Sequence, residues 1–244
     1  MSILNSKKNI YVIDAGNTSI KVAKFLDDEF LEVKKIDFED LEEHIRTQIS
    51  NNDEVVLSSV LSEIQTTHII NLFKECSIID STVTTRMPNN YTSIGTLGTD
   101  RLCNAVFAFT RSTSDFTVVI DIGTCLKFDL VSKKDGYLGG SISPGIDLRY
   151  KSLNSYTGKL PLLSNKNRTK LVGNSTNDSI HSGILNGMEA EIIGVMKNYR
   201  KEYPNLTFFM TGGDAHYFDI DSKNDIFADE NLTLKGLYEI YKQN

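Results

Sequence analysis

The sequence predicts an α/β protein built from two copies of one small domain. A chain of 244 residues is long enough for one or two domains of about 150 residues each. Apolar segments of strand length alternate along it with segments of helical spacing, which is typical of α/β folds. A strand followed by Asp, a glycine turn and Thr occurs twice, at a separation of about 100 residues, the size of one small domain. This repeat favours an internal duplication.

The first half begins as a meander of three strands and then alternates between helix and strand. Short apolar runs bounded by turn residues indicate the strands, and apolar residues three or four positions apart indicate the helices. We expect strands at residues 10–13, 20–25, 30–36 and 55–60, and helices over Leu41–Ile49 and Ile64–Phe73.

A long polar segment, residues 81–98, has no clear periodicity, and such loops in compact domains are often functional. The next apolar residues, among them Leu102 and Val106, have helical spacing. Either Thr99 or Asp100 is expected to cap this helix, because both side chains accept a hydrogen bond from a free backbone N–H.

A polar stretch at residues 110–115 marks the boundary between the two halves, and we place the domains at residues 1–113 and 114–244. The second half again starts with a buried strand and contains one long segment of helical spacing. We expect strands at residues 118–120, 126–131 and 206–210, and helices over Ser175–Tyr199 and Leu232–Tyr241.

The composition excludes several classes of protein. Hydrophobic residues make up 40% and charged residues 24%, with 4 Pro and 16 Gly, which excludes a collagen-like or extensively disordered chain. The net charge of -6 disfavours nucleic acid as the main partner, since a polyanion needs a broad basic face. A small anion is still possible, because backbone amides and a few cations can hold one locally.

The cysteines, histidines and N-terminal segment give no sign of a disulfide framework, a zinc site or a membrane segment. Cys76, Cys103 and Cys125 are an odd number with no Cys-x-x-Cys pair, and we expect reduced, buried thiols. The 4 histidines lack metal-ligand spacing. No apolar stretch of signal-peptide or membrane-spanning length occurs, so a cytoplasmic location is expected.

The repeated segment reads Val12-Ile13-Asp14-Ala15-Gly16-Asn17-Thr18 in the first half and Val119-Ile120-Asp121-Ile122-Gly123-Thr124 in the second. Each copy is followed by a strand that contains a lysine, Lys21 or Lys127. Glycine lets successive N–H groups point into one concavity where a phosphate binds, and the aspartate can hold a hydrated Mg²⁺. Two such turns facing each other would clamp a polyphosphate. Either turn alone is more often an ordinary hairpin turn, and the duplication is what favours the phosphate site.

Two further segments suggest the rest of a phosphoryl-transfer site. Gly212 and Gly213 follow a strand and allow a flat ligand such as a purine to lie against the backbone, although a Gly-Gly pair alone is more often a turn. Asp100 and Arg101 offer a carboxylate to accept a hydroxyl proton and a cation near the acceptor. The alternative is a helix-capping aspartate and a surface arginine. No Gly-x-x-x-x-Gly-Lys-Ser/Thr element is present, so this is not a Walker-type nucleotide site.

In this order, the motifs resemble those of type III pantothenate kinase, a family of the acetate and sugar kinase, chaperone and actin superfamily. The resemblance covers nearly the whole chain and is carried by Asp14–Lys21, Leu97–Arg101, Asp121–Thr124, Gly139–Gly145, Asn174–Thr176 and Thr211–Asp214. It implies two duplicated ribonuclease-H-like domains, which is the actin-like ATPase fold. It also implies a homodimer in which the neighbouring subunit completes the pantothenate pocket.

The resemblance further implies transfer of the γ-phosphoryl group of ATP to pantothenate, the first step of coenzyme A biosynthesis. The ATP-binding residues would be Asp14, Ala15, Gly16, Asn17, Thr18, Ser19, Ile20, Lys21, Thr124, Gly212 and Gly213. The pantothenate-binding residues would be Tyr91, Gly98, Thr99, Asp100, Arg101 and Thr176. Asp100 would accept the hydroxyl proton, and Arg101 would pair with the substrate carboxylate. Mg²⁺ would lie near Asp14, and Asp121 would be a ligand of the monovalent cation, K⁺ or NH₄⁺, that the family requires.

Two positions depart from the family pattern. The usual Tyr-x-x-Pro element is here Tyr91-Thr92-Ser93-Ile94, which keeps the spacing and loses the rigid proline. After the second turn the family commonly has Ala and, two residues later, Thr, where this chain has Cys125 and Lys127. An extra cation at this place can alter phosphate or cation binding, or simply point outward.

Two other classes of function remain as alternatives. One is a non-catalytic accessory regulator, which would need a DNA-binding element that the acidic balance and the lack of a clustered basic helix argue against. The other is a different enzyme on the same fold, such as a sugar or acetate kinase or a polyphosphate phosphatase. The Gly98–Arg101 element favours pantothenate, and the chain is short for the inserted subdomains of sugar kinases.

Overall fold

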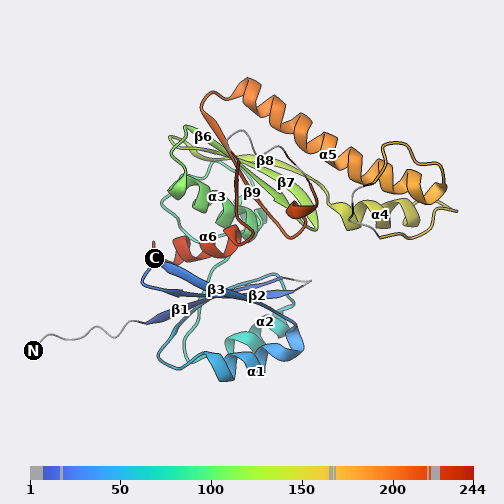
Figure 1. The fold of residues 1–244 in the computed structure, drawn as a ribbon. Coiled ribbons are helices and arrows are strands. Elements are labelled where there is room, and N and C mark those ends of the chain that lie inside the picture. Colours follow the sequence, from blue (N-terminus) through green and yellow to red (C-terminus); the bar gives the residue numbers. More distant parts are fainter. Residues whose placement is uncertain (1–7, 17–18, 165–166, 168, 219, 221–225) are drawn as a thin grey trace, which may run out of the picture. The chain divides into compact units, whose positions relative to one another are not determined.

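The chain forms two compact units in the computed structural model, which describes residues 8–16, 19–164, 167, 169–218, 220 and 226–244 (Figure 1). Unit 1 consists of residues 1–86, 92–107 and 232–244. Unit 2 consists of residues 87–91 and 108–231.

Unit 1 contains a five-stranded mixed sheet in the order β3-β2-β1-β4-β5. The strands are β1 (Asn9–Ala15), β2 (Ile20–Leu26), β3 (Glu29–Ile36), β4 (Glu54–Ser59) and β5 (Ser77–Ile78). The first three form the expected antiparallel meander, and β4 is parallel to β1. Val12 and Ile13 in the central strand are both fully buried. Because successive side chains point to opposite faces, both faces of this sheet are covered.

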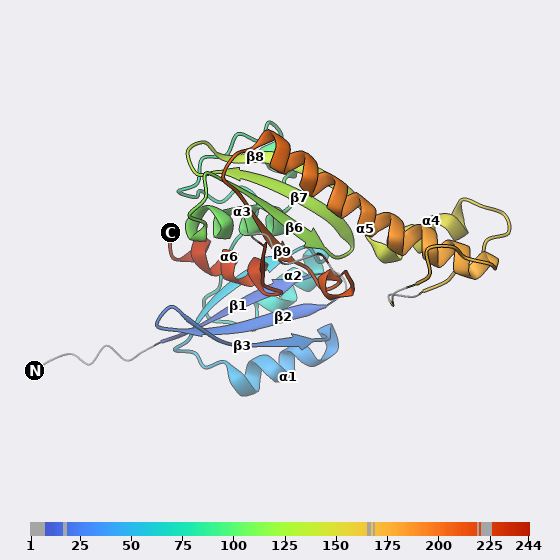
Figure 2. The same ribbon diagram turned by 45° about the horizontal axis from the view of Figure 1, so that its top comes forward.

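Helices cover the two faces of this sheet (Figures 1 and 2). The helices α1 (Phe38–Gln48) and α2 (Glu63–Ile70) pack on one face, where Leu41, Ile45 and Ile69 are buried against the strands. The helix α6 (Leu232–Tyr241) contacts β1 and β4 from the other face. There the ring of Tyr238 stacks on Phe25 with centroids 4.0 Å apart.

Unit 2 contains a second five-stranded sheet in the order β10-β9-β6-β7-β8. The strands are β6 (Phe116–Ile122), β7 (Cys125–Ser132), β8 (Gly136–Pro144), β9 (Leu206–Thr211) and β10 (Ile226–Ala228). The long helix α5 (Thr176–Glu202) packs on one face, with Ile184, Met188 and Ile192 buried in the core. The first part of α5 extends beyond the sheet together with α4 (Ile146–Ser155), as Figure 2 shows.

The two sheets have the same topology. In each, the central strand pairs antiparallel with the next strand along the chain and parallel with a later one. Asp14 at the end of β1 is opposite Lys21 on β2 and Ser58 on β4. Asp121 near the end of β6 is opposite Lys127 on β7 and Thr211 on β9. The repeated sequence therefore occupies the same place in both sheets.

The remaining helices are α3 (Thr99–Arg111) and the 3₁₀ turns η1 (Ile94–Thr96) and η2 (Ala215–Tyr217). The sequence did not predict β8, β10 or α4. Strand β8 contains Gly136, Gly139 and Gly140, which weaken the strand pattern because glycine has no side chain to pack. Helix α2 ends at Ile70, earlier than expected, and Leu72 and Phe73 pack on the core from the segment that follows.

The expected domains, residues 1–113 and 114–244, stay a prediction about the duplicated folds. The compact units differ from that division at three places, because residues 87–91 and 108–113 belong to unit 2 and the last helix, α6, belongs to unit 1. Among the residues that the structure describes, no helix is both long and apolar enough to cross a membrane.

The stacking of Tyr238 on Phe25 predicts that α6 stabilises unit 1. Tyr238 is 4% exposed, and its hydroxyl donates a hydrogen bond of 2.6 Å to Asp28. We expect Tyr238→Ala to lower the free energy of unfolding by about 3 kcal/mol, since a buried ring is lost. Tyr238→Phe keeps the ring and should cost less than about 1 kcal/mol, because the hydrogen bond to an exposed carboxylate is weak. Urea unfolding measures both, and equal losses in the two variants would contradict the packing argument.

Candidate functional site

The first phosphate turn lies at the carboxyl end of the central strand of unit 1. Asp14 is half-buried and Ala15 is fully buried. The N–H of Gly16 donates to the carbonyl of Ser19 at 3.2 Å, which closes the turn before β2. Asn17 and Thr18, which were also expected here, lie outside the described residues.

Lys21 follows this turn, after the buried Ile20 at the start of β2. It is the register partner of Asp14. Directly opposite residues of two antiparallel strands place their side chains on the same face of the sheet. The structure therefore brings the predicted Mg²⁺-binding carboxylate and the predicted phosphate-binding lysine to one face of unit 1.

The acceptor segment forms the start of α3. The backbone N–H of Arg101 donates to Oδ1 of Asp100 at 2.8 Å, and Leu102 N–H donates to the carbonyl of Gly98 at 3.1 Å. A Cβ at residue 98 would lie 2.5 Å from Oδ1 of Asp100, so the carboxylate occupies the space that a side chain would need. Arg101 is 4% exposed, and the alternative of a surface arginine is therefore wrong.

The buried thiol of Cys103 lies where the charges of both Asp14 and Asp100 affect its pKa. Cys103 lies one turn after Asp100 on α3 and is fully buried. Burial raises the pKa of the Cys103 thiol well above its usual range, and the negative charges of Asp14 and then Asp100 raise this pKa further. The charges of both carboxylates therefore act at one buried point of unit 1, where the thiol stays protonated.

The second phosphate turn lies at the end of the central strand of unit 2. Asp121 is 8% exposed, while Thr124 in the turn is exposed. The N–H of Gly123 donates to the carbonyl of Cys125 at 3.1 Å, and the carbonyl of Thr124 accepts from the N–H of Gly145 at 3.0 Å. This turn is thus held by its own hydrogen bonds and by the segment after β8.

The predicted adenosine residues pack directly against this turn. The N–H of Asp214 donates to the carbonyl of Ile122 at 2.9 Å. Gly212 has a φ of +100°, and a Cβ there would lie 2.3 Å from the same carbonyl oxygen. Only glycine fits at residue 212, whereas a Cβ at Gly213 would meet nothing within 4 Å. The structure therefore brings Gly212 and the second turn together within unit 2.

Lys127 is largely buried and does not point out to solvent. Its Nζ lies 2.6 Å from Oδ2 of Asp121, and the two side chains are 13% and 11% exposed. The register of β6 and β7 places the two residues directly opposite each other. The departure from the family pattern at residue 127 is thus an ion pair with the aspartate that was expected to bind a monovalent cation.

The two remaining candidates lie at different ends of unit 2. Tyr91 is half-buried, and its ring centroid is 5.7 Å from that of Tyr137 at the start of β8. Thr176 is exposed and begins α5, at the end that extends beyond the sheet beside α4 (Figures 1 and 2). Ser175 caps this helix by accepting the N–H of Asp178 at 3.1 Å. One copy of the chain does not bring Tyr91 and Thr176 together.

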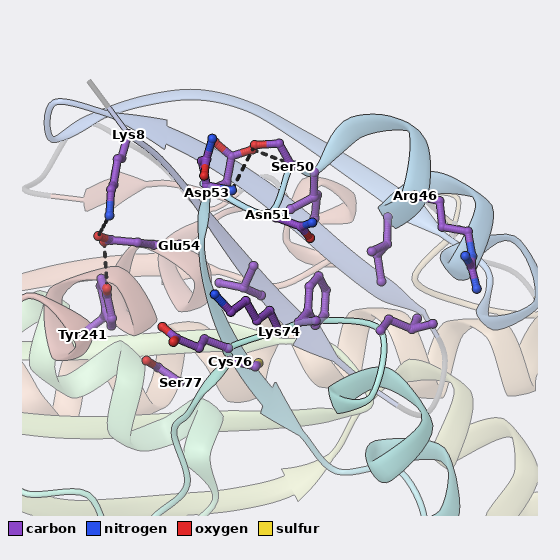
Figure 3. A pocket seen from close by; sticks show the side chains of 17 residues that line it. Lys8, Arg46, Ser50, Asn51, Asp53, Glu54, Lys74, Cys76, Ser77 and Tyr241 are labelled. Atoms are coloured by element: carbon purple, nitrogen blue, oxygen red, sulfur yellow. Dashed lines mark hydrogen bonds and ion pairs between the residues drawn. The ribbon is translucent and has the colours of Figure 1, made fainter. Parts of the chain in front are cut away.

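A pocket of about 1060 Å³ lies elsewhere in unit 1 (Figure 3). Lys8 and Tyr241 line it and both reach Glu54 at the start of β4, with distances of 3.7 Å and 2.8 Å. Burial raises the pKa of its Cys76 thiol to about 11, which makes this thiol a poor nucleophile. None of the predicted site residues lines the pocket. It lies where the parallel strands begin, while ligands of such sheets bind where the strands end.

Within the described part of the chain, no group of three or more His, Cys, Asp or Glu side chains could hold a metal ion. Mg²⁺ does not need such a cage, because it keeps several waters and takes one or two carboxylates together with substrate phosphates. Asp14, at a strand end beside the glycine turn, fits that coordination.

The sequence is similar to one known protein family over most of its length. The family model described as type III pantothenate kinase matches residues 10–198. A type III pantothenate kinase of Christiangramia forsetii is 39% identical over 238 residues, which are 96% of this chain and 98% of that protein. One of Flavobacterium johnsoniae is 36% identical over 238 residues, with 96% and 97% covered.

The chain belongs to the type III pantothenate kinase family. This confirms the resemblance seen in the motifs. Among solved structures, a Baf family protein of Campylobacter jejuni has a TM-score of 0.64 at 22% identity, covering 96% of this chain and 98% of that one. Component A of the Acidaminococcus fermentans (R)-2-hydroxyglutaryl-CoA dehydratase has a TM-score of 0.52 at 12% identity, covering 97% and 99%. The actin-like ATPase fold, with two related α/β halves, is confirmed.

Sequence reasoning on this pantothenate kinase family member missed the role of Cys103 and the contacts of Tyr137. Cys103 was expected only to be a buried thiol, and its position three residues after Asp100 is the signal that it lies beside the acceptor segment. Tyr137 lies in a strand that was not predicted. Its hydroxyl donates to Oδ1 of Asp129 at 2.7 Å, and its ring contacts Tyr91.

The close approach at residue 212 gives a paired prediction. Gly212→Ala forces a side chain into a positive φ and against the Ile122 backbone, and we expect it to lower the free energy of unfolding by about 2 kcal/mol or more. Gly213→Ala is the matched control and should change it by less than about 0.5 kcal/mol. Thermal and urea unfolding measure the difference. A Gly212→Ala protein as stable as the control would show that the backbone is not so constrained.

Proposed function

We propose that this chain is a kinase that transfers the γ-phosphoryl group of ATP to the primary hydroxyl of pantothenate, giving 4'-phosphopantothenate and ADP. This is the first step of coenzyme A biosynthesis. The family membership supports the reaction. The observation that carries the proposal is the pairing of Asp14 with Lys21 at the first glycine turn, since phosphoryl transfer needs a metal-binding carboxylate and a cation beside the phosphates.

In this proposal the two glycine turns bind ATP. The phosphates are held by residues 14–21 and by Thr124, through backbone N–H groups and the ammonium of Lys21. The adenosine lies against Gly212 and Gly213. Asp14 would hold Mg²⁺, which would neutralise negative charge on the phosphates. Within unit 2, the packing of Gly212 on Ile122 supports one continuous nucleotide surface from Thr124 to the glycine pair.

Asp100 and Arg101 act on pantothenate, which also contacts Tyr91, Gly98, Thr99 and Thr176. The pantothenate hydroxyl oxygen bonds to the γ-phosphorus while the bond from that phosphorus to the bridging oxygen of ADP breaks. The carboxylate of Asp100 takes the hydroxyl proton. The Arg101 guanidinium pairs with the substrate carboxylate, for which its fork of donors is suited. The backbone N–H of Arg101 fixes the carboxylate of Asp100 before substrate arrives.

The monovalent cation implied by the family does not fit the residues around Asp121. That carboxylate faces the ammonium of Lys127 at 2.6 Å, with both side chains largely buried. The proposed reaction therefore includes no step that uses K⁺ or NH₄⁺.

The proposed assembly is a homodimer. Its support is the separation of Tyr91 and Thr176 within one chain, together with a set of exposed apolar side chains around α4 and the segment before α5. These are Leu148, Tyr156, Leu162, Leu171 and Val172, with exposed fractions of 36% to 89%. An exposed apolar patch of this kind is typical of a protein–protein contact. The cytoplasmic location stays a prediction from the sequence.

The direct test of the proposed function uses purified full-length protein with ATP, Mg²⁺ and pantothenate. Mass spectrometry of 4'-phosphopantothenate follows the product, and turnover above a no-enzyme control is expected. No product under any salt condition would overturn the proposed activity.

Asp100→Asn tests the proton acceptor. An amide cannot take the hydroxyl proton, so we expect kcat to fall by about 10²- to 10⁴-fold with the fold retained. Asp40→Asn is the matched control. Asp40 lies in the first turn of α1, as Asp100 lies in the first turn of α3, but Asp40 is exposed and is not a predicted site residue. Near-normal kcat in Asp100→Asn, with an unchanged melting temperature, would rule out this role.

Leu171→Glu tests the dimer. Leu171 is 79% exposed, so a charge there costs a folded monomer little, but it would be costly inside an apolar contact. We expect the molar mass in light scattering to fall towards that of one chain and the KM for pantothenate to rise about tenfold. Ile64→Glu is the control, since Ile64 is 84% exposed on α2 of unit 1. A variant that keeps the molar mass of the unsubstituted protein would place the contact elsewhere.

A further inference from the structure

The ion pair between Lys127 and Asp121 is built into the sheet of unit 2. Its two atoms are 2.6 Å apart, and the two side chains are 13% and 11% exposed. The backbone pairing of β6 with β7 places the residues opposite each other, so the pair does not depend on a flexible loop. Exposed ion pairs contribute little, whereas a largely buried pair fixes both partners, because removing one leaves an uncompensated charge.

Three backbone carbonyls that follow Asp121 also accept hydrogen bonds within the protein. The carbonyl of Ile122 accepts the N–H of Asp214 at 2.9 Å, that of Thr124 accepts the N–H of Gly145 at 3.0 Å, and that of Cys125 accepts the N–H of Gly123 at 3.1 Å. A site for K⁺ is made of oxygens that replace the water around the ion, and backbone carbonyls are its usual ligands. Here each of these carbonyls faces an N–H donor and the carboxylate faces an ammonium.

The lysine occupies a defined place in the duplicated fold. Lys21 is opposite Asp14 in unit 1 as Lys127 is opposite Asp121 in unit 2. A second carboxylate, Asp129, lies two residues further along β7 and therefore on the same face of the sheet as Lys127. Lys127, Asp121 and Asp129 thus lie on one face of the sheet within three positions of the strand pair, and the ammonium of Lys127 is paired with Asp121.

We propose that the ammonium group of Lys127 takes the place of the monovalent cation beside Asp121, so that the reaction of this chain does not depend on K⁺ or NH₄⁺. The inference rests on the proposed function. A lysine side chain ends in a compact ammonium with three N–H donors and one positive charge, the same chemistry as an ammonium ion. Lys127 acts through Asp121 and the second turn, as a positioning residue.

The first experiment compares salts with the unsubstituted full-length protein. The protein is exchanged into tetramethylammonium chloride, and product is measured by mass spectrometry, because coupling enzymes can have cation requirements of their own. Replacing the salt with KCl or NH₄Cl at equal ionic strength should change kcat by less than about twofold, since only screening remains to differ. Stimulation of about tenfold or more would overturn the proposal.

The second experiment removes the ammonium. Lys127→Thr removes the charge and opens space beside Asp121, and kcat in tetramethylammonium chloride should fall about tenfold or more, as expected when an electrostatic group is removed from an active site. Addition of KCl or NH₄Cl should restore most of the kcat that Lys127→Thr loses. Lys127→Met fills the space without a charge and should not be rescued. Lys134→Thr, an exposed lysine in the turn after β7, should behave as the unsubstituted protein. A Lys127→Thr enzyme that is fully active without K⁺ would overturn the proposal.

A third readout does not require catalysis. KCl in place of tetramethylammonium chloride should raise the melting temperature of Lys127→Thr by about 2–4 °C, because an ion that binds the folded state stabilises it. The unsubstituted protein should shift by less than about 1 °C. An equal shift in both would show that K⁺ binds despite Lys127 and would overturn the inference.

If no protein turns over pantothenate, the proposed function fails, while the melting comparison still decides the cation question. If Lys127→Thr does not fold, the salt comparison on the unsubstituted protein decides it.

Discussion

The constraint on which the structure depends is the position of an aspartate at the carboxyl end of each central strand. β1 and β6 each pair with an antiparallel neighbour on one side and a parallel neighbour on the other, so their ends are fixed by two ladders. A carboxylate at that place cannot move without disrupting the sheet. Ligands of mixed and parallel sheets bind at this end of the strands, where the chain leaves the ladder and its N–H groups become available. The glycine turns leave directly from these two strand ends, and the segment after β9 is hydrogen-bonded to the end of β6.

The two copies differ in how they balance the charge of that aspartate. In unit 1 burial raises the pKa of the Cys103 thiol and keeps it protonated, and the negative charges of Asp14 and then Asp100 raise this pKa further. Because the thiol stays neutral, it adds no third negative charge beside the two carboxylates. One carboxylate can then bind a divalent cation and the other can accept a proton. In unit 2 the Lys127 ammonium balances Asp121 within the protein itself. In the proposed roles, the aspartate at the end of β1 binds a metal ion, whereas the aspartate at the end of β6 is balanced by the lysine of the next strand.

The fold and most of the candidate site were readable from the sequence because they follow local rules. Strand, turn and lysine recur in order, and the helices α1, α3 and α5 have clear apolar spacing. The edge strand β8 was not readable, since its glycines remove the side chains that mark a strand. The stacking of Tyr238 on Phe25 depends on long-range packing that no short window of sequence contains. The direction of Lys127 was open for the same reason, because strand register alone decides which face it joins.

Replacing a free cation by a lysine changes what controls the site. A bound ion must be taken from solution and loses its freedom of movement, so its occupancy depends on concentration, whereas a tethered ammonium is present whenever the sheet is folded. The tether also limits the geometry, since one Nζ with three donors cannot surround itself with oxygens as K⁺ does. The carbonyls of Ile122, Thr124 and Cys125 fit this limit, because each already accepts a backbone N–H on one of its lone pairs. The charge beside Asp121 is therefore set by the sequence and not by the salt around the protein.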